Sequence, residues 1–387
     1  MSHRDRRRVQ LSKVRSFVGG VFGADLHVKR IESLADATFG VMHSASLAVA
    51  MIGQALAQAR GLVTKHAIKQ VDRMLSNNGI DVWESFARWV PHQIGERKDI
   101  LVAMDWTDFD HDDQATLALH LINGHGRAAP LLWLSVCKDE LKDQRNNFED
   151  KCLHRLAELV PAGCRVTILA DRGFGDQKLF AFLVELGFGY VIRIRGNIHV
   201  TDAQGTTKPA AEWVGKGGRA RKLMDARVTA KGQQVGAVVC VHAKNMKEPW
   251  CLATSERDAT AAVLINHYSK RWTIEPQFRD TKDLRFGMGL SSTRIGEPTR
   301  RDRLLLVSAF ATALLTLLGA VGESLGMDRL LKSNTSKKRT HSLFRQGCML
   351  YELIPNMPEQ RLTPLLKKFA EAVSGTGFFP IVVAPAK

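Results

Sequence analysis

The feature that most constrains the fold of this chain is an alternation of short apolar runs and helix-like segments between residues 96 and 195. The runs are rich in β-branched or large apolar residues, as is typical of strands buried on both faces. Their order predicts a three-stranded meander, a helix, a fourth strand, a second helix and a fifth strand. The predicted elements are Ile100–Phe109, Thr116–Ile122, Leu131–Cys137, Asn146–Val160, Val166–Ala170, Gln177–Leu186 and Tyr190–Arg195. This pattern predicts an α/β fold with a mixed sheet flanked by helices.

Two aspartates directly follow two of these apolar runs. Asp105 comes after the run that starts at Ile100, and Asp171 comes after the run that starts at Cys164. Because sites in open α/β sheets gather at strand ends, we expect both carboxylates at the rim of the sheet. Each aspartate also fits an N-cap or turn role, and the residues after Asp105 offer alternative ligands. These alternatives are Asp108, Asp110, His111, Asp112 and Asp113.

A third carboxylate belongs to a Y-x2-R-x3-E-x6-K string formed by Tyr268, Arg271, Glu275 and Lys282. At about 100° per helical residue, all four side chains fall on one narrow stripe. Such a stripe is a poor core face, because unpaired buried charge is costly, but it suits a site for a metal ion and phosphates. The alternative is a solvated face on which Arg271 simply pairs with Glu275 one turn later.

A proline interrupts this predicted helix. Pro276 removes a backbone hydrogen bond and clashes with the carbonyl of Trp272, so the helix should kink or be interrupted there. The angular placement of Lys282 is weakened accordingly. Trp272, Ile274 and Phe278 point away from the polar stripe and are predicted to lie in the core.

The three acidic residues together predict a metal centre. Asp105, Asp171 and Glu275 would repel one another at close range unless cations neutralised them. Their hard oxygen ligands favour Mg²⁺ or Mn²⁺, and a pair of such ions is a recurring device for in-line displacement at phosphorus. We therefore predict that these three residues are both catalytic residues and metal ligands.

Four segments carry a resemblance to a known family. They are Met104-Asp-Trp-Thr, Leu169-Ala-Asp-Arg-Gly-Phe-Gly, Trp250-Cys-Leu-Ala-Thr-Ser and the string from Tyr268 to Lys282, with a weaker likeness from Lys65 to Ser76. With them the chain resembles bacterial insertion-sequence transposases of the DDE type, in the branch marked by the tyrosine-arginine-glutamate-lysine (YREK) signature. The resemblance spans most of residues 65–350. The order and spacing of these segments together make the resemblance specific, whereas any one segment alone would be weak evidence for it.

The resemblance implies an RNase H-like core, with the first acid on the first strand, the second beside the fourth, and an insertion before the glutamate. It implies that Asp105, Asp171 and Glu275 hold two Mg²⁺ or Mn²⁺ ions and that one site nicks the transposon end and joins it to target DNA. Tyr268, Arg271 and Lys282 would contact the phosphates that flank the cleaved bond.

Three further residues complete the predicted DNA-binding set. Trp250 would stack on an unpaired or flipped base, although a Trp in the core of the insertion fits equally well. Arg279 and Arg285 lie within and just after the helix of the YREK string and are predicted to bind DNA.

The charge of the chain agrees with a nucleic-acid partner. A net charge of +16 favours a polyanion such as double-stranded DNA, because each neutralised phosphate releases counterions. An acidic membrane surface, or a generally basic proteome, is the alternative. The uncharged stretch Leu304–Gly322 is nearly long enough to span a bilayer, but a helix buried against the sheet explains it better.

Cysteine usage and the N-terminus predict a cytoplasmic protein, and the resemblance implies a bacterial one. The six cysteines show no zinc-like spacing and are expected to be reduced. The basic N-terminus lacks the apolar core of a signal peptide. Pairing of two DNA ends needs two subunits, so we expect a homodimer in the DNA complex.

The chain divides into three predicted regions. Residues 1–95, with apolar periodicity in Val41–Arg60 and Lys65–Leu75 and a turn at Asn77–Gly79, are expected to form a helical DNA-binding domain. A plain helical packing domain is the alternative, because no helix-turn-helix pattern is visible. Residues 96–325 are expected to form the catalytic domain, with a β-rich insertion at about 196–254. Residues 326–387 are a helical, basic region for DNA or dimer contact, or simply a solvated segment.

Two other functions remain open from the sequence. An RNase H-like nuclease or resolvase would cut DNA without strand transfer. A catalytically decayed protein would bind DNA and inhibit a related enzyme.

Overall fold

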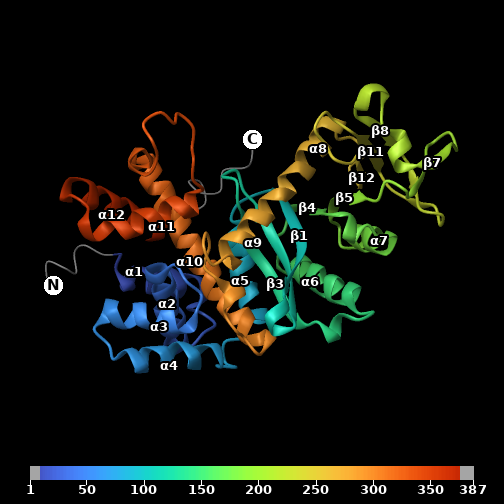
Figure 1. Ribbon diagram of the computed structural model, residues 1–387. Coiled ribbons are helices and arrows are strands. Elements are labelled where there is room, and N and C mark those ends of the chain that lie inside the picture. Colours follow the sequence, from blue (N-terminus) through green and yellow to red (C-terminus); the bar gives the residue numbers. More distant parts are fainter. Residues whose placement is uncertain (1–8, 375–387) are drawn as a thin grey trace.

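The computed structural model describes residues 9–374 and places an eight-stranded mixed sheet at the centre of the molecule (Figure 1). The strand order is β3-β2-β1-β4-β5-β12-β11-β8. The strands are β1 (Asp99–Phe109), β2 (Gln114–Ile122), β3 (Ala128–Cys137), β4 (Arg165–Ala170), β5 (Gly189–Ile194), β8 (Arg221–Met224), β11 (Ala237–Val241) and β12 (Trp250–Thr254).

The first five strands have RNase H-like topology. β1, β2 and β3 form an antiparallel meander, while β4 is parallel to β1 and β5 is parallel to β4. Helix α6 (Arg145–Leu159) connects β3 to β4, and α7 (Gln177–Glu185) connects β4 to β5. The order of strands and helices predicted from the apolar runs is therefore confirmed, as is the fold class.

The segment 196–254 is β-rich, as predicted, and it also extends the central sheet. β12, β11 and β8 continue the sheet beyond β5, and every added pairing is antiparallel. This extension covers the edge of β5, which would otherwise present unpaired backbone groups. A second, four-stranded sheet contains β6 (His199–Thr201), β7 (Thr207–Pro209), β9 (Arg227–Val228) and β10 (Gln233–Gln234).

The N-terminal region is helical, as predicted, but one predicted stretch is broken. Its helices are α1 (Leu11–Phe22), α2 (Val28–Ser44), α3 (Val49–Arg60), α4 (Thr64–Leu75) and α5 (Val82–Ile94). The stretch Val41–Arg60 spans the end of α2 and all of α3, and these two helices meet at 94°. The chain turns at Ala45, which has a left-handed φ of 47°. The predicted turn at 77–79 is confirmed, and Asn77 Oδ1 accepts the amide of Gly79 at 2.9 Å.

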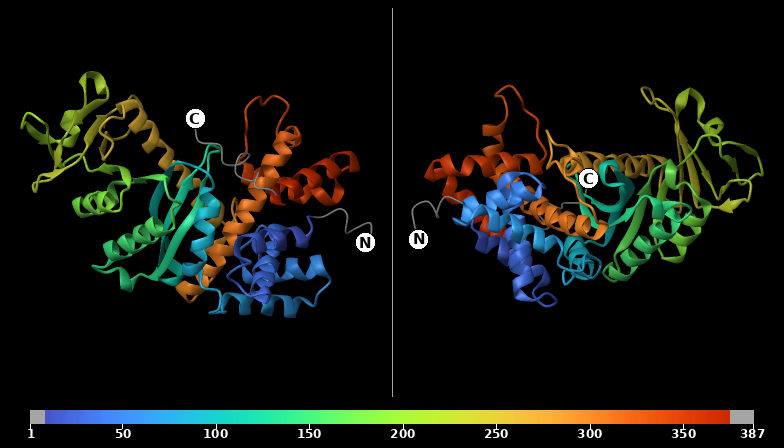
Figure 2. Two further views of the ribbon diagram at one scale, coloured as in Figure 1. Left: turned by 180° about the vertical axis from the view of Figure 1, so that it is seen from behind. Right: turned by 60° about the horizontal axis from the view of Figure 1, so that its bottom comes forward.

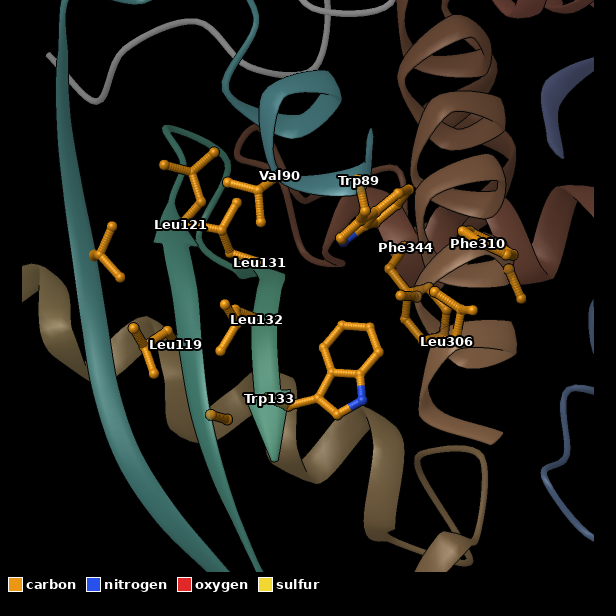
Figure 3. Packing of buried hydrophobic residues seen from close by; sticks show 14 of the residues in the cluster. Trp89, Val90, Leu119, Leu121, Leu131, Leu132, Trp133, Leu306, Phe310 and Phe344 are labelled. Atoms are coloured by element: carbon orange, nitrogen blue, oxygen red, sulfur yellow. The ribbon is translucent and has the colours of Figure 1, made fainter. Parts of the chain in front are cut away.

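Helix α10 (Pro298–Ser324) joins the regions of the molecule. It contacts β3 on one side and α2, α11 (Leu343–Leu353) and α12 (Glu359–Ser374) on the other (Figures 1 and 2). Figure 3 shows Trp133 of β3, Trp89 of α5 and Phe310 of α10 in this packing. The helix is long and apolar enough to cross a membrane, yet most of its apolar stretch is buried inside the fold. The predicted packing of this stretch against the sheet is confirmed.

Asp302 of α10 makes protein stability depend on pH. Its Oδ1 accepts the backbone amide of Ser135 at 3.1 Å, and burial raises the pKa of its carboxyl to about 7. The folded state therefore holds this proton more tightly than the unfolded state does between pH 4 and pH 7. Relative to Asp302→Asn, the wild type should lose unfolding free energy as pH rises through this window. Urea unfolding of both proteins across the window measures the difference, and parallel curves would contradict the prediction.

Candidate active site

Asp105 lies on β1, and Asp171 directly follows β4, the strand parallel to it. β1 and β4 are in register through Met104 and Ala170, and an aspartate comes next after each of these residues. Asp171 is at a strand end, as predicted. The same prediction was wrong for Asp105, because residues 106–109 continue β1 in its pairing with β2. Neighbouring strands are about 4.8 Å apart, and residues in register point to the same face of the sheet. Asp171 also caps a short 3-10 turn, because its Oδ1 accepts the amide of Gly173 at 2.7 Å.

The face that carries both aspartates is covered by a helical segment in three parts. These parts are α8 (Ala261–Lys270), the 3-10 turn η7 (Arg271–Thr273) and α9 (Ile274–Lys282). The turn η7 precedes Pro276 by one helical turn, where the missing amide and the proline ring disturb the α-helical pattern. The predicted interruption is confirmed. Figure 1 shows α9 beside β1.

Arg271 connects two of the three predicted acids. Its Nη1 lies 3.4 Å from Asp105 Oδ2, and its Nη2 lies 3.2 Å from Glu275 Oε1. The Arg271 side chain is buried, whereas Glu275 is exposed. The pairing of Arg271 with Glu275, which was the alternative to a site role, therefore exists together with the contact to Asp105. One guanidinium is therefore shared between a carboxylate on β1 and a carboxylate on α9.

Asp105 lies within the electrostatic influence of the other two acids. Burial raises the pKa of the Asp105 carboxyl to about 6. The charge of Arg271 opposes this rise, while the negative charges of Asp171 and Glu275 add to it. A carboxylate that two neighbours make harder to ionise gains from an added cation. The negative charges of Asp171 and Glu275 thus outweigh what Arg271 alone can balance at this position.

Lys282 extends the polar stripe along β1. Its Nζ donates to Thr107 Oγ1 at 2.9 Å and to the backbone carbonyl of Asp108 at 2.6 Å. Burial lowers the pKa of the Lys282 amine, and the nearby charges of Asp108 and Asp110 act in the opposite direction. The amine is therefore two residues along the strand from Asp105, even though Pro276 interrupts the helix between Glu275 and Lys282.

Tyr268 of α8 and Trp250 of β12 pack against each other. The ring of Trp250 meets the ring of Tyr268 edge to face at 4.9 Å. Tyr268 is buried in a small core with Leu169 and Val191, and Arg271 lies 5.9 Å from its ring. The structure thus gives Trp250 a packing role, but against Tyr268 of α8 and the central sheet rather than in a core of the insertion alone. Its stacking on a base stays a prediction, as does a phosphate contact by Tyr268.

Trp272 is not in the core, so this part of the prediction was wrong. Its side chain is 49% exposed, and the guanidinium of Arg271 lies 5.4 Å from its ring. At about 100° per residue, Trp272 falls well over 90° from Ile274 and Phe278 around the helix axis, so these three residues do not share one face. Ile274 is fully buried and Phe278 packs against the core, as predicted.

Three of the alternative carboxylates near Asp105, those of Asp108, Asp110 and Asp112, have cationic partners. Asp108 and Asp110 both pair with Lys138, at 3.6 Å and 2.5 Å. Asp112 binds the guanidinium of Arg301 and accepts the amide of Ile295. These contacts favour Asp105 as the site residue of β1.

The remaining predicted DNA-binding residues lie on the surface near the site. Arg279 and Arg285 are both exposed, and the guanidinium of Arg285 lies 5.1 Å from the ring of Phe286. Their contact with DNA stays a prediction.

The structure also adds a buried carboxyl that the sequence did not single out. Glu149 of α6 accepts the indole Nε1 of Trp106 at 2.8 Å, and burial raises its pKa to about 7. Trp106 follows Asp105 on β1 and points to the opposite face of the sheet. Glu149 therefore holds β1 through Trp106, on the face of the sheet opposite Asp105. A lone Glu within a helical pattern gave no signal of this contact.

The acidic cluster fits divalent cations in its chemistry. All three acids supply hard oxygen donors. Across residues 9–374, however, no group of three or more His, Cys, Asp or Glu side chains is already arranged around a metal position. Arg271 lies between Asp105 and Glu275 and provides the neutralising charge there.

Comparison with known proteins places this geometry in a family. The family described as "Transposase DDE domain" matches residues 97–311, which is more than half of the chain. A comparison with curated proteins gives no match. The matched segment starts before β1, ends within α10 and contains Asp105, Asp171 and Glu275. The chain therefore belongs to the transposase DDE domain family.

Proposed function

We propose that this protein is a DNA transposase of the YREK branch, which binds transposon ends and catalyses metal-dependent strand cleavage and strand transfer. One observation carries the proposal above all. Asp105 on β1 and Asp171 directly after β4 follow paired residues of two parallel strands, and Arg271 contacts both Asp105 and Glu275. Acids that are far apart in the sequence thus gather beside two cationic side chains.

Asp105, Asp171 and Glu275 would hold the divalent cations, Mg²⁺ or Mn²⁺ and two in number. When bound, such ions neutralise phosphate charge and lower the pKa of an attacking hydroxyl. The carboxylates would fix the position of that charge, and Glu149 would hold β1 steady through Trp106.

Arg271 and Lys282 would position the DNA phosphates. Arg271 presents a planar guanidinium that can bind a phosphate bidentately, whereas Lys282 acts as a point charge. Both are anchored on β1 close to Asp105, so a phosphate that bridged them would lie beside the acidic cluster. The ring of Tyr268 contacts the guanidinium of Arg271 and would help to keep it in position.

The N-terminal helices supply a surface for the transposon ends. The exposed side of α4 carries Lys65, His66, Lys69 and Arg73, so its outer face is cationic. We assign residues 1–95 to end recognition and 96–325 to catalysis, with DNA contact or dimerisation left to 326–387. In this last region Lys332 pairs with Asp328 and Arg339 with Glu323, so part of its charge is used internally. The protein would act in the cytoplasm as a dimer on DNA.

A strand-transfer assay tests the proposal. Duplexes that carry the DNA flanking the reading frame are incubated with the protein and Mg²⁺, together with a supercoiled target plasmid. Joined products support the proposal. Cleavage without joining would indicate a nuclease or resolvase, and salt-sensitive binding without cleavage would indicate a decayed inhibitor.

Arg271 should compete with metal for the acidic cluster. Its replacement by Gln keeps a hydrogen-bonding group but removes a positive charge next to Asp105 and Glu275. We expect Arg271→Gln to bind Mn²⁺ roughly tenfold more tightly without DNA, because a nearby unit charge repels a dication by about 1–2 kcal/mol. Calorimetric titration of the DNA-free protein measures this, with Arg172→Gln, which removes an exposed arginine that pairs with Glu248, as the control. An unchanged or weaker affinity for Mn²⁺ would contradict the prediction.

A further inference from the structure

An apolar tip follows α9 directly. We call residues Leu284, Arg285 and Phe286 the 284–286 tip. The side chain of Leu284 is 73% exposed and that of Phe286 is 59% exposed, with a cation between them. Scattered apolar residues on a surface are ordinary, but two large ones beside an arginine at the end of a site helix form a distinct surface.

The tip is held in a fixed shape. Asp283 Oδ1 accepts the amides of Arg285 and Phe286 at 2.8 Å and 2.6 Å. The carbonyl of Asp283 accepts the amides of Gly287 and Gly289 at 3.1 Å and 3.0 Å. These hydrogen bonds hold the loop against the end of α9. The backbone that carries Leu284 and Phe286 therefore has a defined turn conformation.

The turn needs its glycines. A Cβ at Gly287 would lie 2.3 Å from the carbonyl oxygen of Arg279, which is far too close. Gly289 has a φ of +73°, which favours glycine. The local sequence thus fixes the direction of the tip.

The tip also lies close to the acidic cluster. Lys282, two residues before Leu284, is anchored to Thr107 and Asp108 of β1. DNA phosphates held by Lys282 would therefore bring neighbouring base pairs within reach of the tip.

We infer that the 284–286 tip is a wedge that enters between stacked base pairs of bound DNA next to the cleavage site. This inference rests on the proposed function. Apolar side chains that separate base steps, flanked by cations on the phosphates, are a known means of kinking a duplex. Leu284 and Phe286 supply the apolar surface, and Arg285 supplies the cation. A second copy of the chain is a poorer occupant, because each copy carries a charge of +16 and the tip places a cation at its centre.

Permanganate oxidation of unstacked thymines tests the wedge. Duplexes tiled across the DNA that flanks the reading frame are bound to the full-length protein in Ca²⁺ buffer and then oxidised. We expect reactive thymines at a defined step with the wild type. The double variant Leu284→Ser, Phe286→Ser should bind the same duplexes but lose this reactivity. Fluorescence anisotropy measures binding separately, so failure to bind DNA at all would overturn the proposed function as well as the wedge.

Two controls keep the result interpretable. Val184→Ser removes another exposed apolar side chain, 60% exposed on α7 and away from α9, and should retain the reactive thymines. Thermal unfolding of the double variant checks its fold, and Phe286→Leu, which keeps an apolar side chain, should restore part of the reactivity. Reactive thymines that persist in the double variant, or are absent from the wild-type complex, would overturn the wedge. So would a wild-type dimer without DNA that the double variant loses, because the tip would then be a protein interface.

Discussion

Asp105→Asn should abolish DNA cleavage and strand transfer while leaving DNA binding intact. Asparagine keeps the size of the side chain and an oxygen for the backbone amide of Trp106. It removes the negative charge that stands beside Asp171 and faces Arg271. Loss of a charged metal ligand should lower the rate on the order of a thousandfold or more, because most of the catalytic gain in such sites is electrostatic.

The measurement is single-turnover cleavage of an end duplex in Mg²⁺, with binding followed by anisotropy. Asp108→Asn is the matched control, since Asp108 lies on the same strand and pairs with Lys138 on the surface. It should retain the rate of the wild type. Full activity in Asp105→Asn would remove this residue from catalysis. Asp171→Asn and Glu275→Gln are expected to behave like Asp105→Asn.

The second large effect concerns stability, and it comes from Arg301. This residue is fully buried in α10, donates from Nε to Gln114 Oε1 at 2.7 Å and binds the carboxylate of Asp112. Its guanidinium also lies 3.8 Å from the centroid of the Phe109 ring. Removing one partner of such a pair leaves the other charge buried and uncompensated. Arg301→Met should therefore cost about 3–5 kcal/mol of unfolding free energy.

Urea unfolding monitored by tryptophan fluorescence tests this expectation. Arg294→Met is the control, because Arg294 is an exposed arginine close by in the sequence, and it should change stability little. A loss no larger than that of the control would show that the Arg301 network contributes little. Because Asp112, Gln114 and Phe109 lie where β1 turns into β2, this network also holds the strand that carries Asp105.

The strands of the core were predictable because each is encoded locally. Runs such as Val166–Ala170 are short, almost wholly apolar and bounded by turn residues, which favours a central strand over a helix. The strand order, with β4 next to β1, then brings Asp105 and Asp171 together through backbone pairing alone. The polar stripe from Arg271 to Lys282 was likewise visible in the spacing of its residues.

Other features depended on contacts between distant segments. The apolar runs of the insertion did not indicate that β12, β11 and β8 would continue the central sheet. Which strand pairs with the edge of β5 depends on contacts between segments that are distant in the sequence. The break between α2 and α3 was missed because apolar periodicity continues across Ala45. Trp272 is exposed because it lies on a different side of the helical segment from the buried Ile274.

By itself, then, the sequence determined the element order, the two aspartates that follow apolar runs and the charged stripe, since local patterns of burial and charge encode each of them. Only the tertiary structure decided that Arg271 would lie between Asp105 and Glu275, that Asp112 would bind Arg301, and that Trp250 would pack on Tyr268. Each of these pairs joins separate elements. Which carboxylate meets which cation is set by the packing of the whole sheet against α9 and α10, and sequence spacing does not carry that information.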